Sequence, residues 1–150
     1  MITDQLIEKI IDMQNPTCVG LDTLFDYLPD EMKSGAKSFE DAAERVFEFN
    51  KKIIDTVRDV VPSVKVQIAY YEMYGVAGMK AYEETLKYAA EKGLVVIADA
   101  KRNDIGSTAS CYAKTFLGET EVNGNSFKPF PADYVTVNGY LGTDGIAPFV

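Results

Sequence analysis

The chain has 150 residues, of which 47% are hydrophobic and 25% charged, a balance that indicates a globular domain rather than a disordered one. Asp and Glu total 23 and Lys and Arg total 15, and the resulting net charge of −8 disfavours sequence-independent nucleic-acid binding. The sequence contains no His, which excludes imidazole-based nucleophilic catalysis and His-ligated zinc.

The cysteines and the N-terminal segment bear on the cellular compartment of the protein. Cys18 and Cys111 form no CxxC pair, which favours a reducing environment, and we expect both to be small core residues. No basic segment followed by an apolar run opens the chain, and no stretch approaches ~18 uninterrupted apolar residues. We therefore expect a cytoplasmic protein without a signal peptide or a membrane span.

The spacing of apolar residues predicts an alternation of helices and strands. In chain order the expected elements are helix 3–13, strand 17–22, helix 39–59, strand 64–69, helix 76–91, strand 94–99, helix 105–116, loop 118–132 and strand 133–138. Single helices between strands predict βαβ units and a parallel sheet. The nearly continuous apolar strands agree, because parallel strands are covered on both faces. The predicted fold class is therefore α/β.

The helices carry more detailed expectations. We expect Thr3 or Asp4 to cap the first helix and Gly93 to end the third. Asn50, on an apolar helix face, is expected to be a buried amide with its hydrogen bonds satisfied. The residues expected to face inward on the last two helices are Val76, Met79, Leu86 and Ala90, then Ile105, Ala109, Tyr112, Ala113 and Phe116.

Polar side chains gather where the predicted strands end. Asp22, Asp99 and Asn138 each close a strand, and the carboxyl ends of parallel strands are where α/β folds place their chemistry. Two-residue alternation puts Lys65 and Gln67 on one face of their strand, and Asp99 and Lys101 on one face of theirs. The bland interpretation of any one of these residues is a solvated charge at a strand end. Several of them at one rim favour a common pocket instead.

The most informative stretch is residues 99–108, where Lys101 stands between Asp99 and Asp104 directly after a buried strand. Desolvating such a lysine is costly unless the charges are paired. Neighbouring carboxylates keep its ammonium protonated, which suits a proton donor beside a developing anion. The alternative is a structural ion-pair network in which Asp104 caps the helix that follows.

This stretch resembles the signature of the orotidine 5′-phosphate decarboxylase family. The pattern Asp99-x-Lys101-x-x-Asp104-Ile105, followed by Gly-Ser-Thr-Ala, is similar to the form of one bacterial and archaeal branch. The segments 19–22 and 64–72 match the strands on either side in order and spacing. Residues 137–142 resemble the fourth strand, although Gly139 stands where that branch usually has Pro.

The resemblance implies a carbon–carbon lyase that converts orotidine 5′-monophosphate to uridine 5′-monophosphate in pyrimidine biosynthesis, without metal or organic cofactor. Lys65, Asp99, Lys101 and Asp104 would form an array of alternating charge. Lys101 would protonate C6 of the pyrimidine as carbon dioxide leaves, Asp99 would lie near the substrate carboxylate, and Lys65 would orient the array.

The resemblance also implies substrate and partner contacts. Asp22 would hydrogen-bond the nucleotide sugar, and Asn138 is assigned to substrate binding. Asp104, with Ile105 and Thr108 close by, would reach into the active site of a partner subunit, which implies a homodimer.

The predicted fold is the first half of a (β/α)8 barrel, because a complete barrel needs about 250 residues and this chain supplies four strands. Residues 1–150 are therefore expected to be the N-terminal half of one decarboxylase domain, inactive alone and poorly soluble or oligomeric because its sheet edges are open. Two alternatives stay open. One is a non-catalytic half-barrel that binds a nucleotide or a partner. The other is a magnesium-dependent sugar-phosphate decarboxylase or synthase of the same superfamily, which would place Glu where Lys65 stands.

Overall fold

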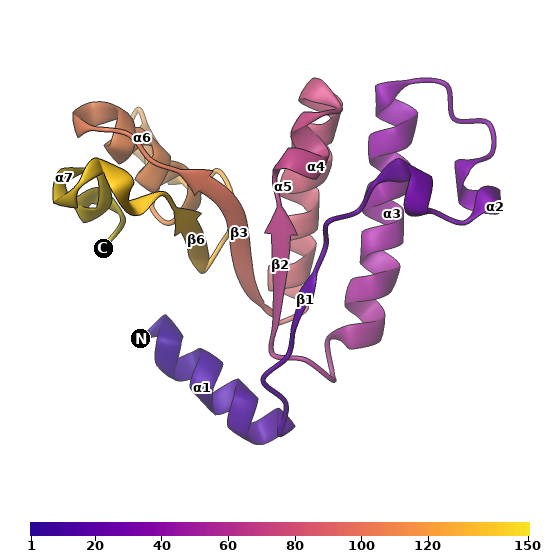
Figure 1. Cartoon of the computed structure of the whole chain (residues 1–150), viewed down its shortest axis with the longest axis horizontal. Helices are drawn as coiled ribbons and strands as arrows, with labels where there is room; N and C mark the ends of the chain where they lie inside the picture. Colours follow the sequence, from indigo (N-terminus) through magenta and orange to yellow (C-terminus); the bar gives the residue numbers. More distant parts are fainter.

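The computed structural model describes residues 1–150 and contains a four-stranded sheet with helices packed around it (Figure 1). The strands, in their spatial order, are β1 (Cys18–Gly20), β2 (Ser63–Gln67), β3 (Val95–Arg102) and β6 (Tyr134–Val137). Every neighbouring pair is parallel. The expected α/β class with a parallel sheet is therefore confirmed.

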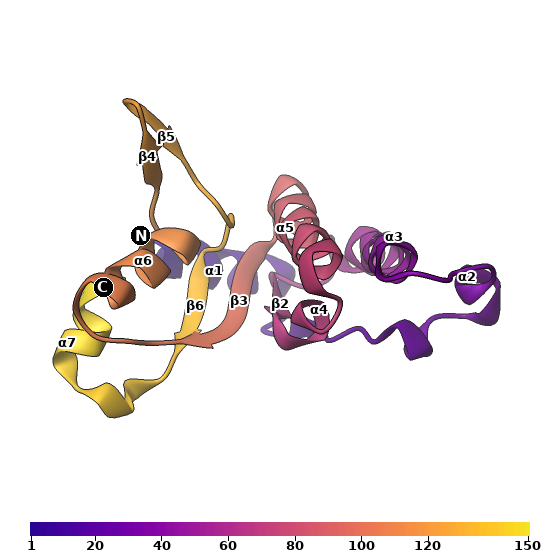
Figure 2. The ribbon, with the colours of Figure 1, turned by 90° about the horizontal axis from the view of Figure 1, so that it is seen from above.

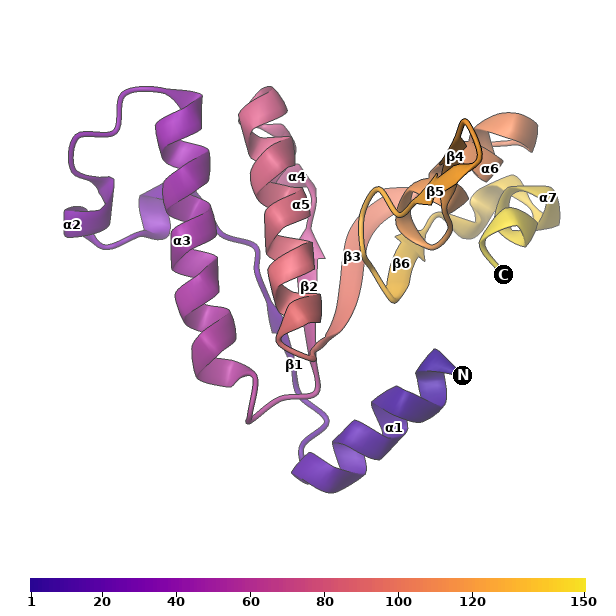
Figure 3. The same cartoon turned by 180° about the vertical axis from the view of Figure 1, so that it is seen from behind.

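The longer helices connect consecutive strands. They are α3 (Phe39–Val57) between β1 and β2, α5 (Gly75–Glu91) between β2 and β3, and α6 (Gly106–Phe116) between β3 and β6. Figures 1 and 3 show α3 and α5 side by side, with α1 (Ile2–Met13) at the end of the sheet from which the strands start. The short elements are η1 (Phe25–Tyr27), α2 (Asp30–Lys33), α4 (Ala69–Glu72), η2 (Gly139–Leu141), α7 (Thr143–Ile146) and η3 (Ala147–Phe149).

The core lies where α3 and α5 cover the two central strands. Val64 and Val66 of β2 and Val96 of β3 are fully buried on the face that the helices cover. On the opposite face Lys65, Gln67 and Ile97 are only partly buried, so these strands are not covered on both faces along their whole length as expected. Gly78 allows α5 to pack tightly against α4, because a Cβ atom at this position would lie 1.8 Å from the carbonyl oxygen of Tyr71. This close packing holds the segment after β2 firmly in place.

Some expectations about the helices are wrong. Met1, not Thr3 or Asp4, precedes the first helical residue, whereas Gly93 follows α5 with a φ of +80° and ends it as expected. Val76 is 88% exposed and Ala90 is exposed as well. The face that α5 buries is rotated from the expected one and consists of Gly78, Ala81, Tyr82, Thr85, Leu86 and Ala89.

The expected loop 118–132 contains an antiparallel hairpin, β4 (Thr120–Val122) and β5 (Asn125–Phe127), which Figure 2 shows extending away from the sheet. Asn123 and Gly124 form its two-residue turn with φ values of +50° and +79°, the combination that suits a type I′ turn. Both strands are short and exposed, so they lack the apolar alternation that marks a strand in a sequence.

The sheet has open edges at β1 and β6. Beside β6 lies a groove of about 760 Å³ whose lining is mostly apolar and includes Val135, Val137, Ile146 and Phe149.

Cys18 and Cys111 are exposed free thiols, so their expected core placement is wrong. Cys18 lies on an edge strand, and Cys111 lies on the outer side of α6. None of the helices has both the length and the apolar character needed to cross a bilayer.

Candidate active site

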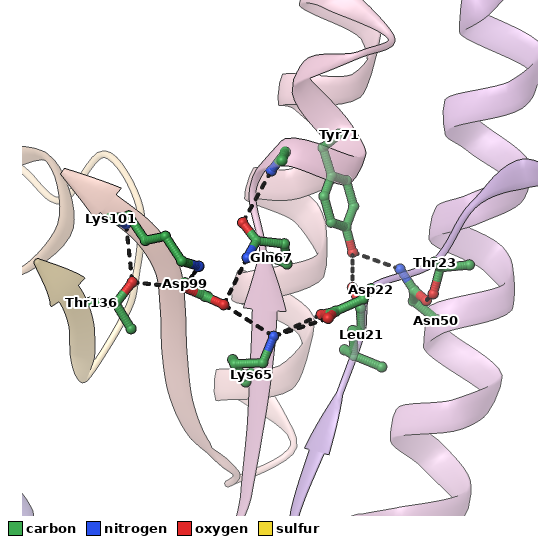
Figure 4. Close-up of polar contacts among 11 residues, drawn as sticks. Leu21, Asp22, Thr23, Asn50, Lys65, Gln67, Tyr71, Asp99, Lys101 and Thr136 are labelled. Carbon is green, nitrogen blue, oxygen red and sulfur yellow. Dashed lines mark hydrogen bonds and ion pairs between the residues drawn. The ribbon is translucent and has the colours of Figure 1, made fainter. Parts of the chain in front are cut away.

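Side chains from neighbouring strands meet at the carboxyl end of the sheet (Figure 4). Lys65 and Gln67 come from β2, Asp99 and Lys101 from β3, and Asp22 follows β1. All five belong to one connected set of hydrogen bonds and ion pairs. The expected convergence of these groups at one rim is therefore confirmed.

Asp99 is the centre of the set. Its Oδ2 accepts hydrogen bonds from Lys65 Nζ at 3.2 Å and from Gln67 Nε2 at 2.7 Å. Its Oδ1 accepts from Lys101 Nζ at 2.5 Å and from the Thr136 hydroxyl at 2.8 Å. Only 10% of the side chain is exposed. Burial raises the pKa of Asp99, but the hydrogen bonds from Lys101, Thr136 and Lys65 outweigh burial and leave the pKa below its ordinary value. The site thus holds a charged, nearly buried carboxylate.

Lys65 joins two carboxylates from different strands. Its Nζ lies 2.8 Å from Asp22 Oδ1, 3.2 Å from Asp22 Oδ2 and 3.2 Å from Asp99 Oδ2. Burial lowers the pKa of Lys65, and the hydrogen bonds to Asp22 and Asp99 more than offset this, so the pKa lies above its ordinary value. Lys65 is therefore a fixed positive charge with its three N–H groups engaged.

Lys101 is held differently from the expectation. Its Nζ contacts Asp99, but its side chain is 63% exposed and makes no ion pair with Asp104. Within the chain, Lys101 is therefore paired with Asp99 alone, and its ammonium is not enclosed between two carboxylates. The backbone of Lys101 has a φ of +50°, in the left-handed region, at an irregularity in the pairing of β3 with β6. One contact for three N–H donors leaves the ammonium able to meet another group.

Four predicted site residues lie outside this set. Asp104 Oδ1 accepts from the amide of Ile105 at 2.7 Å, and no side-chain hydrogen bond caps α6, so Asp104 does not act as the helix cap. Ile105 is 59% exposed, contrary to its expected inward orientation, and Thr108 is exposed. Asn138 Oδ1 accepts from the amide of Tyr140 at 3.0 Å and stabilises the turn after β6.

Thr136 is the residue that the sequence analysis missed. It occupies the fourth strand, one residue before the end of an otherwise apolar run. Its hydroxyl donates to Asp99 and accepts from the Lys101 amide at 3.0 Å. The available signal was a lone polar residue on the same face of β6 as Asn138, given the two-residue alternation of a strand.

A buried network supports the loop that carries Asp22. Asn50 is fully buried, its Nδ2 donates to the Tyr71 hydroxyl at 2.8 Å, and its Oδ1 accepts from the Thr23 hydroxyl at 2.7 Å. The Tyr71 hydroxyl donates to the carbonyl oxygen of Leu21 at 3.4 Å. The residues on both sides of Asp22 are thereby tied to α3 and α4. The expectation of a satisfied buried amide at Asn50 is confirmed.

Comparison with known proteins agrees with this geometry. The family model for orotidine 5′-phosphate decarboxylase / HUMPS proteins matches residues 16–150. The chain is 47% identical over 151 residues to the orotidine 5′-phosphate decarboxylase of Clostridium acetobutylicum, and 45% identical to that of Clostridium perfringens strain SM101. All of this chain is covered in both matches, but the chain spans about half of each relative, 48%.

Solved structures extend the comparison to the fold. The structure of Leishmania donovani OMP decarboxylase superposes with a TM-score of 0.72 at 28% identity, over 98% of this chain and 48% of that chain. A structure from Toxoplasma gondii superposes with a TM-score of 0.78 at 32% identity, over 97% of this chain and 43% of that chain. The four parallel βα units correspond to the first half of a (β/α)8 barrel, as expected.

Proposed function

Because this chain belongs to the orotidine 5′-phosphate decarboxylase / HUMPS family, we propose that the whole protein decarboxylates orotidine 5′-monophosphate to uridine 5′-monophosphate. Residues 1–150 would form the N-terminal half of its single catalytic domain. The observation that carries the proposal is the buried Asp99 carboxylate flanked by the ammonium groups of Lys65 and Lys101. The free cysteines and the biosynthetic role favour the cytoplasm, and the net charge of −8 favours a small nucleotide over a nucleic acid as ligand.

The proposed reaction needs fixed charge more than covalent chemistry. The bond from C6 to the carboxyl carbon breaks, carbon dioxide leaves, and the electron pair stays on C6. A proton then moves from Lys101 Nζ to C6, and the neutral amine takes a proton from solvent. No cofactor serves as an electron sink in this scheme, so an ammonium that is already oriented must stabilise the carbanion as it forms.

The contacts of the two lysines support different roles for them. Lys65 engages Asp22 and Asp99 with its three N–H groups, so it suits a positioning role. Lys101 has a single partner and a largely exposed side chain, so it can turn an N–H group toward a substrate. Asp22, at the rim and 40% exposed, has room for a sugar hydroxyl beside its contact with Lys65.

Lys101→Ala in the full-length protein tests the proposed acid. We expect the turnover of orotidine 5′-monophosphate, measured as the release of carbon dioxide, to fall by at least on the order of 10²–10⁴-fold. This is the usual contribution of general acid catalysis. Lys87→Ala removes an exposed lysine from α5 and should leave turnover unchanged. If Lys101→Ala keeps most of the activity, the assigned role is wrong.

The magnesium-dependent alternative is disfavoured by Lys65. Its ammonium lies between the carboxylates of Asp22 and Asp99, where it would repel a bound cation. We expect turnover to be insensitive to EDTA. Loss of turnover in EDTA that magnesium restores would establish the alternative. A non-catalytic protein that keeps the fold would instead bind a 6-substituted uridine monophosphate without turning over orotidine 5′-monophosphate.

We also propose a homodimer in which Asp104 completes the partner's site. Asp104 has no ion-pair partner within the chain, and Ile105 and Thr108 beside it are exposed and free to meet a second subunit. Mixing full-length Asp104→Ala with full-length Lys101→Ala tests this arrangement. If subunits exchange freely, half the dimers carry one intact site, so about a quarter of the sites should recover activity. No recovery despite subunit exchange would rule out a shared site.

A further inference from the structure

β3 and β6 lose their regular pairing at the point where β3 carries its charged side chains. Regular pairing stops after Ala98 and resumes at Arg102, so residues 99–101 lie opposite Thr136 alone. Extra residues on one strand leave backbone groups without ladder partners. Here the amide of Lys101 finds a partner in a side chain, the hydroxyl of Thr136, at 3.0 Å.

The same hydroxyl also reaches the central carboxylate. Thr136 Oγ1 donates to Asp99 Oδ1 at 2.8 Å, and Lys101 Nζ donates to that same oxygen at 2.5 Å. The contacts form a closed ring from the Lys101 amide through Thr136 and Asp99 to the Lys101 ammonium (Figure 4). The Thr136 hydroxyl therefore contacts both the backbone amide of Lys101 and the carboxylate that binds the Lys101 ammonium.

We propose that Thr136 is a positioning residue for the proposed decarboxylation, fixing the backbone of Lys101 and the carboxylate of Asp99 relative to each other. The inference rests on the proposed function and assigns one more residue to that site. A left-handed conformation costs a non-glycine residue free energy and persists only where its surroundings hold it. Thr136 accepts a hydrogen bond from the amide of that residue, and its second hydrogen bond orients the carboxylate that holds the Lys101 ammonium.

Three substitutions in the full-length protein separate the hydroxyl from the shape of the side chain. Thr136→Val keeps the shape and removes the hydroxyl, Thr136→Ala removes the hydroxyl without the risk of overpacking, and Thr136→Ser keeps the hydroxyl. Thr56→Val makes the same chemical change on the exposed side of α3, where the hydroxyl bonds only to the Lys52 carbonyl oxygen. Thr56→Val should match the unmodified protein.

We expect Thr136→Val and Thr136→Ala to lower kcat by on the order of 10- to 100-fold with little change in KM, because a hydrogen bond to a charged group is lost from the reacting array. The acid limb of the kcat profile should move to higher pH, since the hydroxyl helps to keep Asp99 ionised. Thr136→Ser should keep both the kcat and the acid limb of the unmodified protein. A purely structural role would lower stability without moving the pH profile.

Hydrogen exchange of the Lys101 amide gives a readout that does not depend on turnover. Exchange should be faster in Thr136→Val and Thr136→Ala than in the unmodified protein and Thr136→Ser, at equal global stability. Unchanged exchange, or unchanged kcat and pH profile in an active enzyme, would overturn the inference. An unmodified full-length protein that lacks decarboxylase activity would instead overturn the proposed function, while the exchange data would still decide whether Thr136 positions Lys101.

Discussion

Asn50→Leu should destabilise the protein by removing the centre of the buried network beneath Asp22. Asn50 is fully buried and joins the Thr23 hydroxyl, at 2.7 Å, to the Tyr71 hydroxyl, at 2.8 Å. Leucine has a similar volume but offers no donor or acceptor. The Thr23 hydroxyl then loses its acceptor, and Tyr71 loses its donor and keeps the long 3.4 Å contact with the Leu21 carbonyl oxygen and its interaction with the Thr85 hydroxyl.

The size of the effect follows from the groups left without partners. A buried polar group that loses its hydrogen bond costs about 1–3 kcal/mol, and two such groups remain here. The Leu21 contact holds the cost at Tyr71 near the lower end, so we expect a loss of about 2–4 kcal/mol. The double variant Asn50→Leu with Tyr71→Phe removes one stranded hydroxyl, and its cost should be lower than the sum of the single costs by at least about 0.5 kcal/mol.

Urea denaturation of the full-length protein measures these costs, with every variant at the same protein concentration because the apparent stability of a self-associating protein depends on its concentration. Asn125→Leu, on the exposed hairpin, provides a matched control that should change the free energy of unfolding by less than about 0.5 kcal/mol. A cost below about 1 kcal/mol for Asn50→Leu would refute the reasoning. Strict additivity in the double variant would refute it as well.

Three further predictions concern packing, pH and the sheet edges. Gly78→Ala should cost about 1–3 kcal/mol or more in thermal or urea unfolding, because the new methyl group meets the Tyr71 carbonyl oxygen. The pKa of Asp99 is lowered in the folded state, so its ionised carboxylate stabilises the protein above about pH 4, and this stabilisation is lost on further acidification. Asp99→Asn should therefore make the free energy of unfolding less dependent on pH in the acid range. Residues 1–150 expressed alone should sediment as oligomers or precipitate, and a stable monomer with turnover would contradict this.

The sequence predicted the alternation of strands and helices because buried parallel strands and amphipathic helices carry strong apolar patterns. The hairpin 120–127 was missed because its stability lies in a two-residue turn and backbone pairing, neither of which depends on apolar spacing. The inward face of α5 was misplaced because Gly78, which packs against α4, and the buried Ala81 have too little apolar surface to mark it. Small residues at a tight interface leave only a weak pattern.

At the site, strand alternation was sufficient to bring Lys65, Asp99 and Lys101 together, because successive side chains on one face of a strand must point the same way. The exposure of Lys101 was not predictable, since it depends on an irregularity in the pairing of β3 with β6. The contribution of Thr136 depends on the same irregularity. The alternation of residues along each strand therefore predicts which strands supply the charged side chains. The pairing between strands determines the contacts that each charged side chain makes.

The position of Lys65 explains how the carboxylates of Asp22 and Asp99 can lie at one rim of the sheet. Asp22 follows β1 and Asp99 belongs to β3, and β2 is the strand that lies between β1 and β3. The only element able to place a positive charge between the two carboxylates is therefore β2, and it does so with Lys65. Without that ammonium, repulsion between the carboxylates would raise the pKa of Asp99 and weaken its hold on Lys101. Lys65 thus controls the proposed acid through Asp99, although the ammonium groups of both lysines bind different oxygens of that carboxylate.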